Sequence, residues 1–322
     1  SPNLMLTANR KPFARLSKEP PTLPVGTQPR QTVELDCGTI SYLRYGSGPP
    51  LLLVHGIPTS CRLWEPLLGI LGAHYECFVP DLNGLGRSAP KPSADLSSPG
   101  QAQMLNQFLD AMGVDQCFAV FHDQGGSHGM QFLKAHGDRV KAVMFTNVVC
   151  YDNWPVPAIA LTVWLGRRGW IPRLAKLRLL QAVLRFHTLP QTVFRGAFPE
   201  DLRNDWYWAL DYGGEPLQHW IRYVTSQSAE WTQDAIPTLR EWTKPAKVLW
   251  AAQDHYLPVS WGHKLASDIP GAADDPSLLP FAGHFWQAEV PISGAQAIVA
   301  FFENAQKSEA ALVAEEESAN ET

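Results

Sequence analysis

An aspartate stands where the chain turns sharply from a predicted strand into a predicted helix. The apolar run 116–121 predicts a buried strand, and it breaks abruptly into the sequence HDQGG at residues 122–126. In a strained turn of this kind the nucleophile stands clear of the backbone, and the N–H of the next residue helps to stabilise negative charge. An aspartate that attacks carbon forms an ester, which suits the displacement of a halide or the opening of an epoxide. We therefore predict that Asp123 is a nucleophile.

Two other interpretations of the same segment compete with this one. Residues 125–129 match G-x-S-x-G, the pattern that places a nucleophilic serine, here Ser127, at such a turn. That choice would extend the strand through Asp123, Gln124 and two glycines, all poor strand formers, so we favour Ser127 in the first turn of the helix. The third interpretation makes Asp123 a helix N-cap with no role in catalysis.

An acid and a histidine follow at the ends of later predicted strands. Asp254 comes after the strand 247–251, and His284 comes after the last predicted strand, 278–280. A histidine in this position takes a proton from water, and a carboxylate beside it orients and supports the imidazole. We expect His284 to activate the water that hydrolyses the ester on Asp123, with Asp254 as its supporting acid.

A fourth signal is the sequence HGIPTS at residues 55–60, directly after another buried strand. The backbone N–H groups of Ile57 and Gln124 are expected to form two donors aimed at a developing negative charge or leaving group. We place His55 beside the substrate and expect its ring, like that of His122, to hydrogen-bond the backbone near the site. The His, Cys and Asp residues show no metal-ligand spacing, so we predict neither a metal site nor a cofactor.

The elements that must position these residues alternate along the chain. Residues 32–36 and 39–45 predict a hairpin, and residues 51–54, 76–79, 116–121, 140–146 and 248–251 predict buried strands. Helical patterns separate them at 62–72, 99–112, 126–136 and 260–268, and a closing helix is expected at 293–304. This alternation predicts an α/β fold with a mostly parallel sheet that helices flank on both faces.

The alternation stops in a segment rich in tryptophan. Residues 150–242 hold eight of the twelve tryptophans and several amphipathic stretches. We predict an inserted helical cap here, over the carboxyl ends of the strands, where open α/β sheets bind ligands. The core is then expected at 31–149 and 243–306, with an N-terminal arm at 1–30 and a flexible acidic tail at 307–322.

The composition of the chain limits the classes of partner that we expect. A net charge of −5 without a basic run argues against nucleic acid, and no apolar stretch reaches the length of a membrane span. We expect the partners to be a small apolar substrate and water, with neither nucleic acid nor membrane. Five widely spaced cysteines without a C-x-x-C pair suit reduced thiols, so we predict a cytoplasmic protein.

Together these motifs resemble those of haloalkane dehalogenases and epoxide hydrolases, the Asp-nucleophile branch of the α/β-hydrolase superfamily. The resemblance covers about residues 31–305 and rests on HGIPTS with Leu63-Trp64, PDLNGLGRS at 80–88, HDQGG at 122–126 and GHFWQ at 283–287. It implies an α/β-hydrolase fold with a cap and a covalent ester on Asp123, hydrolysed with the help of His284 and Asp254.

The chain departs from the family where the leaving group is bound. Dehalogenases of this kind commonly hold the halide with a Trp after the nucleophile and with an Asn or a second Trp, whereas this chain has Gln124 and Ile57. The side chain of Gln124 offers one N–H donor, and a cap tryptophan such as Trp154, Trp164 or Trp170 offers another, but spacing assigns neither. Epoxide hydrolases use two cap tyrosines, and only Tyr223 stands at about the right distance before Asp254.

These motifs predict a cofactor-free hydrolase, with haloalkane dehalogenation as the leading reaction and epoxide hydrolysis as the alternative. A serine-type esterase or lactonase that uses Ser127, and a descendant that binds a ligand without catalysis, remain as further hypotheses.

Overall fold

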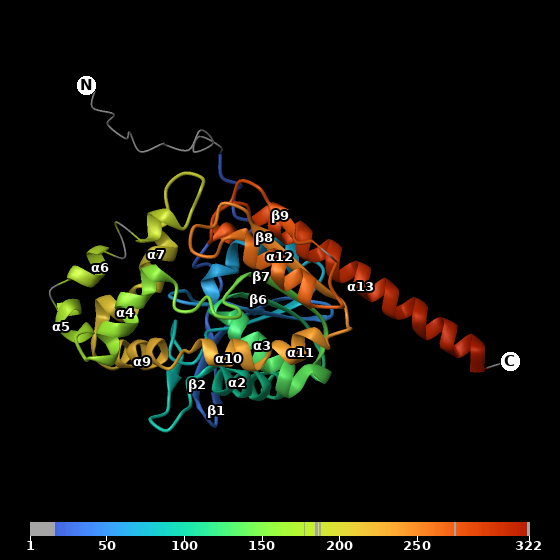
Figure 1. Cartoon of the computed structure of the whole chain (residues 1–322), viewed down its shortest axis with the longest axis horizontal. Helices are drawn as coiled ribbons and strands as arrows, with labels where there is room; N and C mark the ends of the chain where they lie inside the picture. The colour runs from blue at the N-terminus through green and yellow to red at the C-terminus, as the bar shows by residue number, and fades with distance from the viewer. Residues whose placement is uncertain (1–16, 177, 184–185, 187, 274, 321–322) are drawn as a thin grey trace.

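A mixed sheet forms the centre of the molecule (Figure 1). The computed structural model describes residues 17–320 apart from 177, 184–185, 187 and 274. Within these residues the sheet has the strand order β1-β2-β4-β3-β6-β7-β8-β9, and β5 pairs with β2. The pairs of β2 with β1, β4 and β5 are antiparallel, and all pairs from β4 through β3 to β9 are parallel. The mostly parallel sheet that the alternation predicts is confirmed.

The expected strands are present, with boundaries shifted by one or two residues. Their bounds are β1 Gln31–Leu35, β2 Gly38–Gly46, β3 Pro50–Val54, β4 Glu76–Pro80, β6 Cys117–Asp123, β7 Val140–Val148, β8 Ala246–Ala251 and β9 Ser277–Leu279. Every residue of β6 is buried, as expected of a parallel strand covered on both faces. The sequence did not indicate the short strand β5, Ala89–Pro90.

Helices cover the sheet and position the strand ends. The core helices are α1 Leu68–Leu71, α2 Ser98–Ala111, α3 Gln124–His136, α12 Val259–Asp268 and α13 Pro291–Asn320. The helix expected at 62–72 is instead two 3₁₀ turns, Cys61–Leu63 and Glu65–Leu67, followed by α1. Pro66 explains the break, because it has no N–H to donate within a continuous α-helix.

The insertion between β7 and β8 is helical. It contains α4 Pro157–Arg167, α5 Ile171–Lys176, α6 Leu179–Val183, α7 Glu200–Trp206, α8 Trp208–Tyr212, α9 Gly214–Thr225, α10 Ala229–Asp234 and α11 Ile236–Arg240. In Figure 1, α4 to α7 and α9 lie to one side of the sheet, whereas α10 and α11 lie beside α3. The last two helices of the predicted cap segment therefore pack on the core.

The described parts of the N-terminal arm and the C-terminal tail differ from the unstructured segments that the sequence predicts. Residues 1–16 of the predicted arm lie outside the described residues, and the rest of the arm is tied down, with Glu19 N–H donating to the carbonyl of Glu289. The closing helix α13 runs on to Asn320, so the segment expected as a flexible tail continues this helix away from the body (Figure 1).

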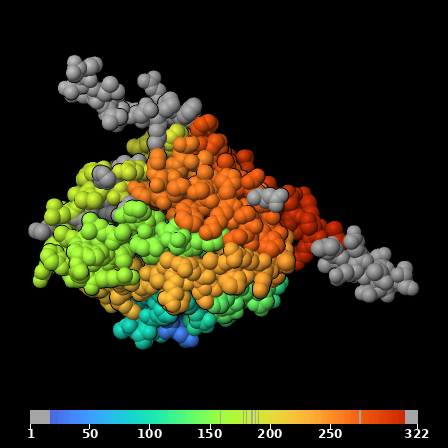
Figure 2. Space-filling view, in the orientation of Figure 1, coloured from blue at the N-terminus to red at the C-terminus, as the bar shows by residue number. Residues whose placement is uncertain are grey.

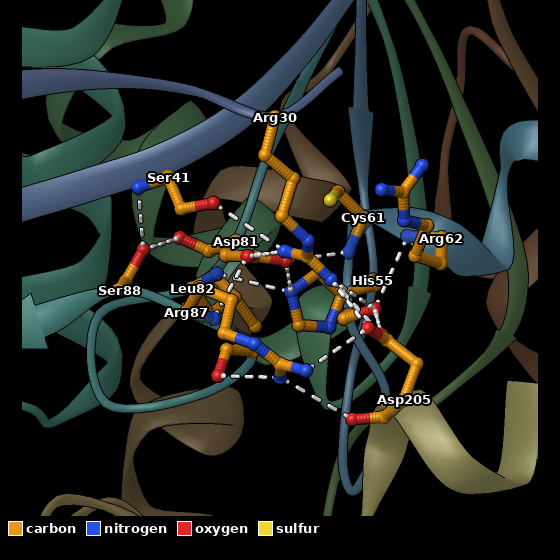
Figure 3. Close-up of polar contacts among 12 residues, drawn as sticks. Arg30, Ser41, His55, Cys61, Arg62, Asp81, Leu82, Arg87, Ser88 and Asp205 are labelled. Atoms are coloured by element: carbon orange, nitrogen blue, oxygen red, sulfur yellow. Dashed lines mark hydrogen bonds and ion pairs between the residues drawn. The ribbon is translucent and has the colours of Figure 1, made fainter. Parts of the chain in front are cut away.

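A buried polar cluster joins the arm, the core and the cap (Figure 3). The Arg30 guanidinium donates to Asp81, in the loop after β4, and to both oxygens of Asp205 in α7, at 2.9 Å each. Asp205 also accepts from Ser60 of the HGIPTS loop. Burial alone would raise the pKa of Asp81, but Arg30, His55 and the backbone N–H groups of Cys61 and Arg87 together outweigh it and the pKa is lowered. This cluster, the Arg30 clamp, holds the cap helix α7 against the loops that carry the site.

Candidate active site

The turn after β6 puts Asp123 in a strained backbone conformation. Its φ of 52° is in the left-handed region that non-glycine residues rarely adopt. The helix α3 begins directly after this residue. Position 125 in its first turn is a glycine, and a Cβ there would lie only 2.4 Å from the carbonyl oxygen of His55. The two loops therefore pack backbone against backbone, which brings the HGIPTS loop to the Asp123 side chain.

The two oxygens of the Asp123 carboxylate have different neighbours. Oδ2 accepts a hydrogen bond from the backbone N–H of Ile57 at 2.7 Å, and the carboxylate also accepts from the N–H of Gln124. Oδ1 lies 3.4 Å from Nε2 of His284. The expected pair of backbone donors is thus aimed at the aspartate itself. This use of the carboxylate differs from the helix N-cap interpretation.

His284 is held between two carboxylates. Its Nδ1 lies 2.7 Å from Oδ2 of Asp254, and its Nε2 faces Asp123. Asp254 is fixed in turn by the N–H groups of Tyr256 and Leu257, at 2.8 and 3.0 Å, and by the side-chain amide of Asn147 at 2.8 Å. The structure brings together the three residues that the sequence places at the ends of β6, β8 and β9.

The electrostatics of the site favour a charged imidazole next to charged aspartates. Burial opposes a charge on His284, but Asp254 and Asp123 outweigh burial and raise its pKa to about 10. Burial would likewise raise the pKa of Asp123, yet its hydrogen bond and charge interaction with His284 lower it. In the free protein at neutral pH, His284 is therefore an imidazolium paired with the Asp123 carboxylate.

A small apolar cavity of about 40 Å³ opens onto these residues between the core and the cap. Core residues in its wall include Ile57, Asp123, Tyr256 and His284, and cap residues include Trp154, Val156, Ile159, Leu189 and Tyr207. A buried water needs roughly 10–15 Å³ on the same kind of measure, so the cavity holds only a few waters or a small ligand.

Among the residues predicted to bind substrate, the structure places Trp154 in the cavity wall and three others elsewhere. Trp164 is 47% exposed on the outside of α4. Tyr223 is fully buried, and its hydroxyl lies 2.7 Å from Nε2 of His128. His55 is also buried outside the wall: Nδ1 lies 2.8 Å from the carbonyl of Gly56, and Nε2 accepts from Leu82 N–H. The predicted backbone bonding of His55 is observed.

The side chain of Gln124 is also turned away from the cavity, because its amide nitrogen lies 3.4 Å from Oε1 of Gln227. The role of Gln124 at the site is confined to its backbone N–H. His122 behaves as expected, with Nε2 2.9 Å from the carbonyl of His284. Burial, with a smaller contribution from His284, lowers the pKa of His122 to about 3, so this ring is neutral.

Ser127 occupies the first turns of α3. It is fully buried, and its hydroxyl lies 2.6 Å from that of Ser98, which in turn lies 2.9 Å from Nδ1 of His128. These contacts turn the serine into the interface between α2 and α3 and away from His284. The position agrees with the interpretation of Ser127 as an ordinary residue of the helix.

Three residues of the site were missed in the sequence. Tyr256 follows Asp254 by two residues, a spacing that could have marked it. Tyr207 is one of many aromatic residues in the cap segment, and its place in the wall depends on how α7 docks. Asn147 ends β7 with a φ of 44°, and its partner Asp254 is 107 residues away, so sequence spacing gives no signal for this contact.

Comparison with known proteins agrees with this architecture. A family model described as alpha/beta hydrolase fold matches residues 49–289. Among solved structures, an alpha/beta hydrolase fold protein from Burkholderia ambifaria superposes with a TM-score of 0.74 at 22% identity, over 87% of this chain and 98% of that one.

Two sequence relatives carry more specific names. Haloalkane dehalogenase 2 of Mycobacterium tuberculosis is 31% identical over 38% of this chain and 42% of its own length. The soluble epoxide hydrolase of a Corynebacterium species is 30% identical over 38% of this chain and 44% of its own length. The chain thus matches less than half the length of either relative. It belongs to the α/β hydrolase fold family and is related, within that family, to haloalkane dehalogenases and epoxide hydrolases.

Proposed function

We propose that the protein hydrolyses a small apolar electrophile through a covalent ester on Asp123. One observation carries this proposal: a carboxylate stands at the strained turn, with Oδ2 accepting from the backbone N–H of Ile57 and Oδ1 directed at His284. The apolar cavity next to it favours a substrate that is small and uncharged.

In the first step, Oδ1 of Asp123 attacks a carbon atom of the substrate. A carbon–oxygen bond forms while the bond to the leaving group breaks, and the leaving group departs with the electron pair. The ester that results is neutral, so His284 loses one of the two negative charges that raise its pKa. Formation of the ester therefore lowers the pKa of His284, the imidazolium releases its proton to solvent, and the neutral imidazole becomes the base.

In the second step, His284 takes a proton from water, and the hydroxide attacks the carbonyl carbon of the ester. Negative charge develops on Oδ2, where the N–H of Ile57 already lies 2.7 Å away. Collapse of the intermediate breaks the bond between the carbonyl carbon and Oδ1, which leaves as the oxygen of the alcohol and takes the proton back from His284. Asp254 keeps the imidazole oriented throughout.

Haloalkane dehalogenation is the reaction that we propose first. A departing halide needs hydrogen-bond donors, and Trp154 lies in the cavity wall at 5% exposure. No described residue accepts a hydrogen bond from its indole N–H, which leaves that group for the ligand. The likeness to haloalkane dehalogenase 2 supports the same choice.

Epoxide hydrolysis is the second candidate, because two tyrosines share the cavity with Asp123. Opening an epoxide produces an alkoxide that requires a proton, and phenols supply it. Tyr207 belongs to the cap, and Tyr256 is held by a hydrogen bond from its hydroxyl to the carbonyl of Thr188 at 2.9 Å. Burial raises the pKa of Tyr256 to about 12, so this phenol keeps its proton at neutral pH.

A trapping experiment tests the proposal. In His284→Ala the ester should form but not hydrolyse, so peptide mass spectrometry after incubation with small bromoalkanes and epoxides should find an adduct on Asp123. An alkyl adduct identifies a dehalogenase and a hydroxyalkyl adduct an epoxide hydrolase. An acyl group on Ser127 after incubation with activated esters, with Asp123 unmodified, would contradict the proposal.

We also propose a reducing compartment, the cytoplasm, as the place of the reaction. All five cysteines are free thiols in the structure, and four of them are buried. This supports an environment in which disulfides do not persist.

A further inference from the structure

The outer surface of the cap carries a cluster of exposed apolar side chains. Six large ones are between 47% and 77% exposed: Leu161, Trp164, Trp170, Leu179, Val183 and Phe186. Among the other described residues, only Tyr212 and Leu278 are large, apolar and similarly exposed. Single exposed apolar residues are ordinary, whereas a cluster marks a surface that contacts something else. We call these six residues the cap patch.

The spacing of the patch residues shows that the helices present them outward. In α4, Leu161 and Trp164 are three residues apart and exposed, while Val163, on the other side of the helix, is buried. From α6 onward, Leu179, Val183 and Phe186 follow at intervals of four and three residues. Helix α4 is thus apolar both toward the protein and toward solvent, which is unusual for a helix that faces water alone.

The charge of this segment is the opposite of that of the rest of the chain. Residues 153–199 contain seven basic residues and no acidic one, which leaves 19 basic and 31 acidic residues elsewhere. Five of the basic side chains are exposed on or beside α4 to α6: Arg167, Arg168, Arg173, Lys176 and Arg178. The Arg168 guanidinium lies 4.0 Å from the ring centre of Trp164, so cations and patch residues are interleaved.

One carboxylate from a neighbouring element faces the basic residues. Asp211 of α8 lines a surface cavity together with Lys176 and Arg178. Arg167, Arg168 and Arg173 lie outside that cavity wall, so the surface keeps an excess of positive charge.

The cap patch lies at one end of the molecule. In Figure 1, α4, α5 and α6 form the end opposite the C-terminus of α13, and in Figure 2 the same green-to-yellow segment makes up that end of the visible surface. Helix α4 also reaches the active-site cavity through Ile159. Helix α4 thus contributes to both the cavity wall and the cap patch.

We propose that the cap patch docks on the surface of an anionic lipid bilayer. Indole, phenyl and aliphatic side chains enter the boundary between headgroups and acyl chains, while the arginines and Lys176 pair with lipid phosphates. The acidic remainder of the chain is repelled by the same bilayer, so the charge asymmetry orients the cap toward the lipid. Surface contact replaces the expectation that no membrane is a partner, which rested on the lack of an apolar stretch long enough to span one. Docking at the surface needs no such stretch, and among the helices in the described part of the chain none could span a membrane. Docking is independent of the reaction at Asp123.

Flotation with lipid vesicles tests this proposal on the full chain. We expect the protein to float with vesicles that contain phosphatidylglycerol, more weakly with phosphatidylcholine alone, and less as salt is raised. Trp164→Ser with Phe186→Ser should reduce the bound fraction, whereas Leu278→Ser, an exposed leucine on β9, should not. Arg167→Glu with Arg173→Glu should weaken binding at least about tenfold, whereas Arg240→Glu should change it little.

Two results would overturn membrane docking. One is equal flotation, or none, with both kinds of vesicle for a protein whose circular dichroism shows that it is folded. The other is a dimer in light scattering that Phe186→Ser dissociates while vesicle binding is absent, which would make a second copy of the chain the occupant of the patch.

Discussion

The charge of one imidazole connects the two chemical steps that we propose. His284 is a cation while Asp123 is a carboxylate, and it becomes a base once Asp123 is an ester. Asp254 forms no bond to the substrate in either step, so the change at His284 comes from Asp123. In this mechanism His284 can therefore accept a proton from water only after Asp123 has formed the ester.

The first prediction concerns Asp123→Asn. The amide keeps the shape of the side chain but removes its charge, so the pKa of His284 should fall from about 10. Turnover should fall roughly a thousandfold or more, because the nucleophile is lost. Imidazole chemical shifts followed by NMR through a pH titration measure the pKa. An unchanged His284 pKa would show that Asp123 does not set it, and Ser127→Ala, expected to keep turnover and pKa, is the control.

The raised pKa of His284 also predicts how stability depends on pH. The folded protein binds this proton more tightly than the unfolded chain, whose histidines have pKa values near ~6.5. The stabilisation that the protonated His284 adds to the free energy of unfolding is therefore fully present below about pH 6.5. It decreases above that pH and is lost as pH rises through about 10. Urea unfolding of the wild type and of Asp123→Asn across this range should show a smaller pH-dependent loss in the variant; equal losses would argue against the ion pair.

At the residue scale, the sequence predicted where the candidate reacting groups lie better than it predicted their surroundings. Asp123, Asp254 and His284 each follow a buried strand, and local patterns reveal such positions. The cavity wall depends on how helices dock, so Trp164 and Tyr223 lie outside it and Tyr256 was missed. Trp154 lies in the wall, but spacing gave no reason to prefer it to Trp164.

At the scale of elements, two loops carry the site because their backbones touch. Gly56 follows β3, and a Cβ built on it would lie 2.3 Å from Oδ2 of Asp123 and 2.5 Å from the nitrogen of Gln124. Both contacts involve groups that the proposed reaction uses. A side chain at position 56 must therefore push the donors and the nucleophile apart.

We predict that Gly56→Ala lowers kcat by about a hundredfold or more, since loss of one such donor has effects of this size. Gly137→Ala is the matched control, because its φ is −64° and its nearest neighbour is the far edge of the Trp242 ring at 3.0 Å. Steady-state kinetics on variants with native circular dichroism give the answer. Wild-type kcat in Gly56→Ala would disprove the role of this backbone contact.

The Arg30 clamp gives a prediction for the contact between cap and core. Removing Arg30 leaves Asp81, which is fully buried, without its guanidinium partner, so Arg30→Met should lower the free energy of unfolding by about 3–5 kcal/mol. Arg44→Met is the control, since Arg44 is 44% exposed in its pair with Glu76 and should change stability by less than about 1 kcal/mol. Equal effects in urea unfolding would mean that the clamp adds no special stability.

The strands were predictable because buried parallel strands are short, uniformly apolar runs. The helices at 62–72 and 293–304 were predicted less well, since Pro66 divides the first and the second continues into an acidic, alanine-rich segment with high helix propensity. The Arg30 clamp joins residues 51 and 175 positions apart in the chain, and no local pattern indicates such contacts.

At the scale of the whole molecule, the substrate space lies where cap and core meet, so its size depends on side chains from both. Leu189 is buried in the cap side of the cavity wall. Leu189→Ala should enlarge the cavity and raise kcat/KM for longer substrates relative to shorter ones, at a cost of about 2–5 kcal/mol in stability. Leu133→Ala, in α3 and outside the cavity wall, should lose stability without this change in preference. A preference unchanged in Leu189→Ala would place the substrate elsewhere.

The ester on Asp123 is the central claim, and a single turnover in water labelled with heavy oxygen tests it most directly. Excess wild-type enzyme is mixed with a limiting amount of the substrate that forms an adduct on Asp123 in His284→Ala. Mass spectrometry then gives the mass of the peptide that contains Asp123. Because water attacks the carbonyl carbon of the ester, one heavy oxygen should appear in the Asp123 carboxylate and the alcohol formed should be unlabelled. Label in the alcohol, with none in Asp123, would show that water attacks the substrate directly and would contradict the account.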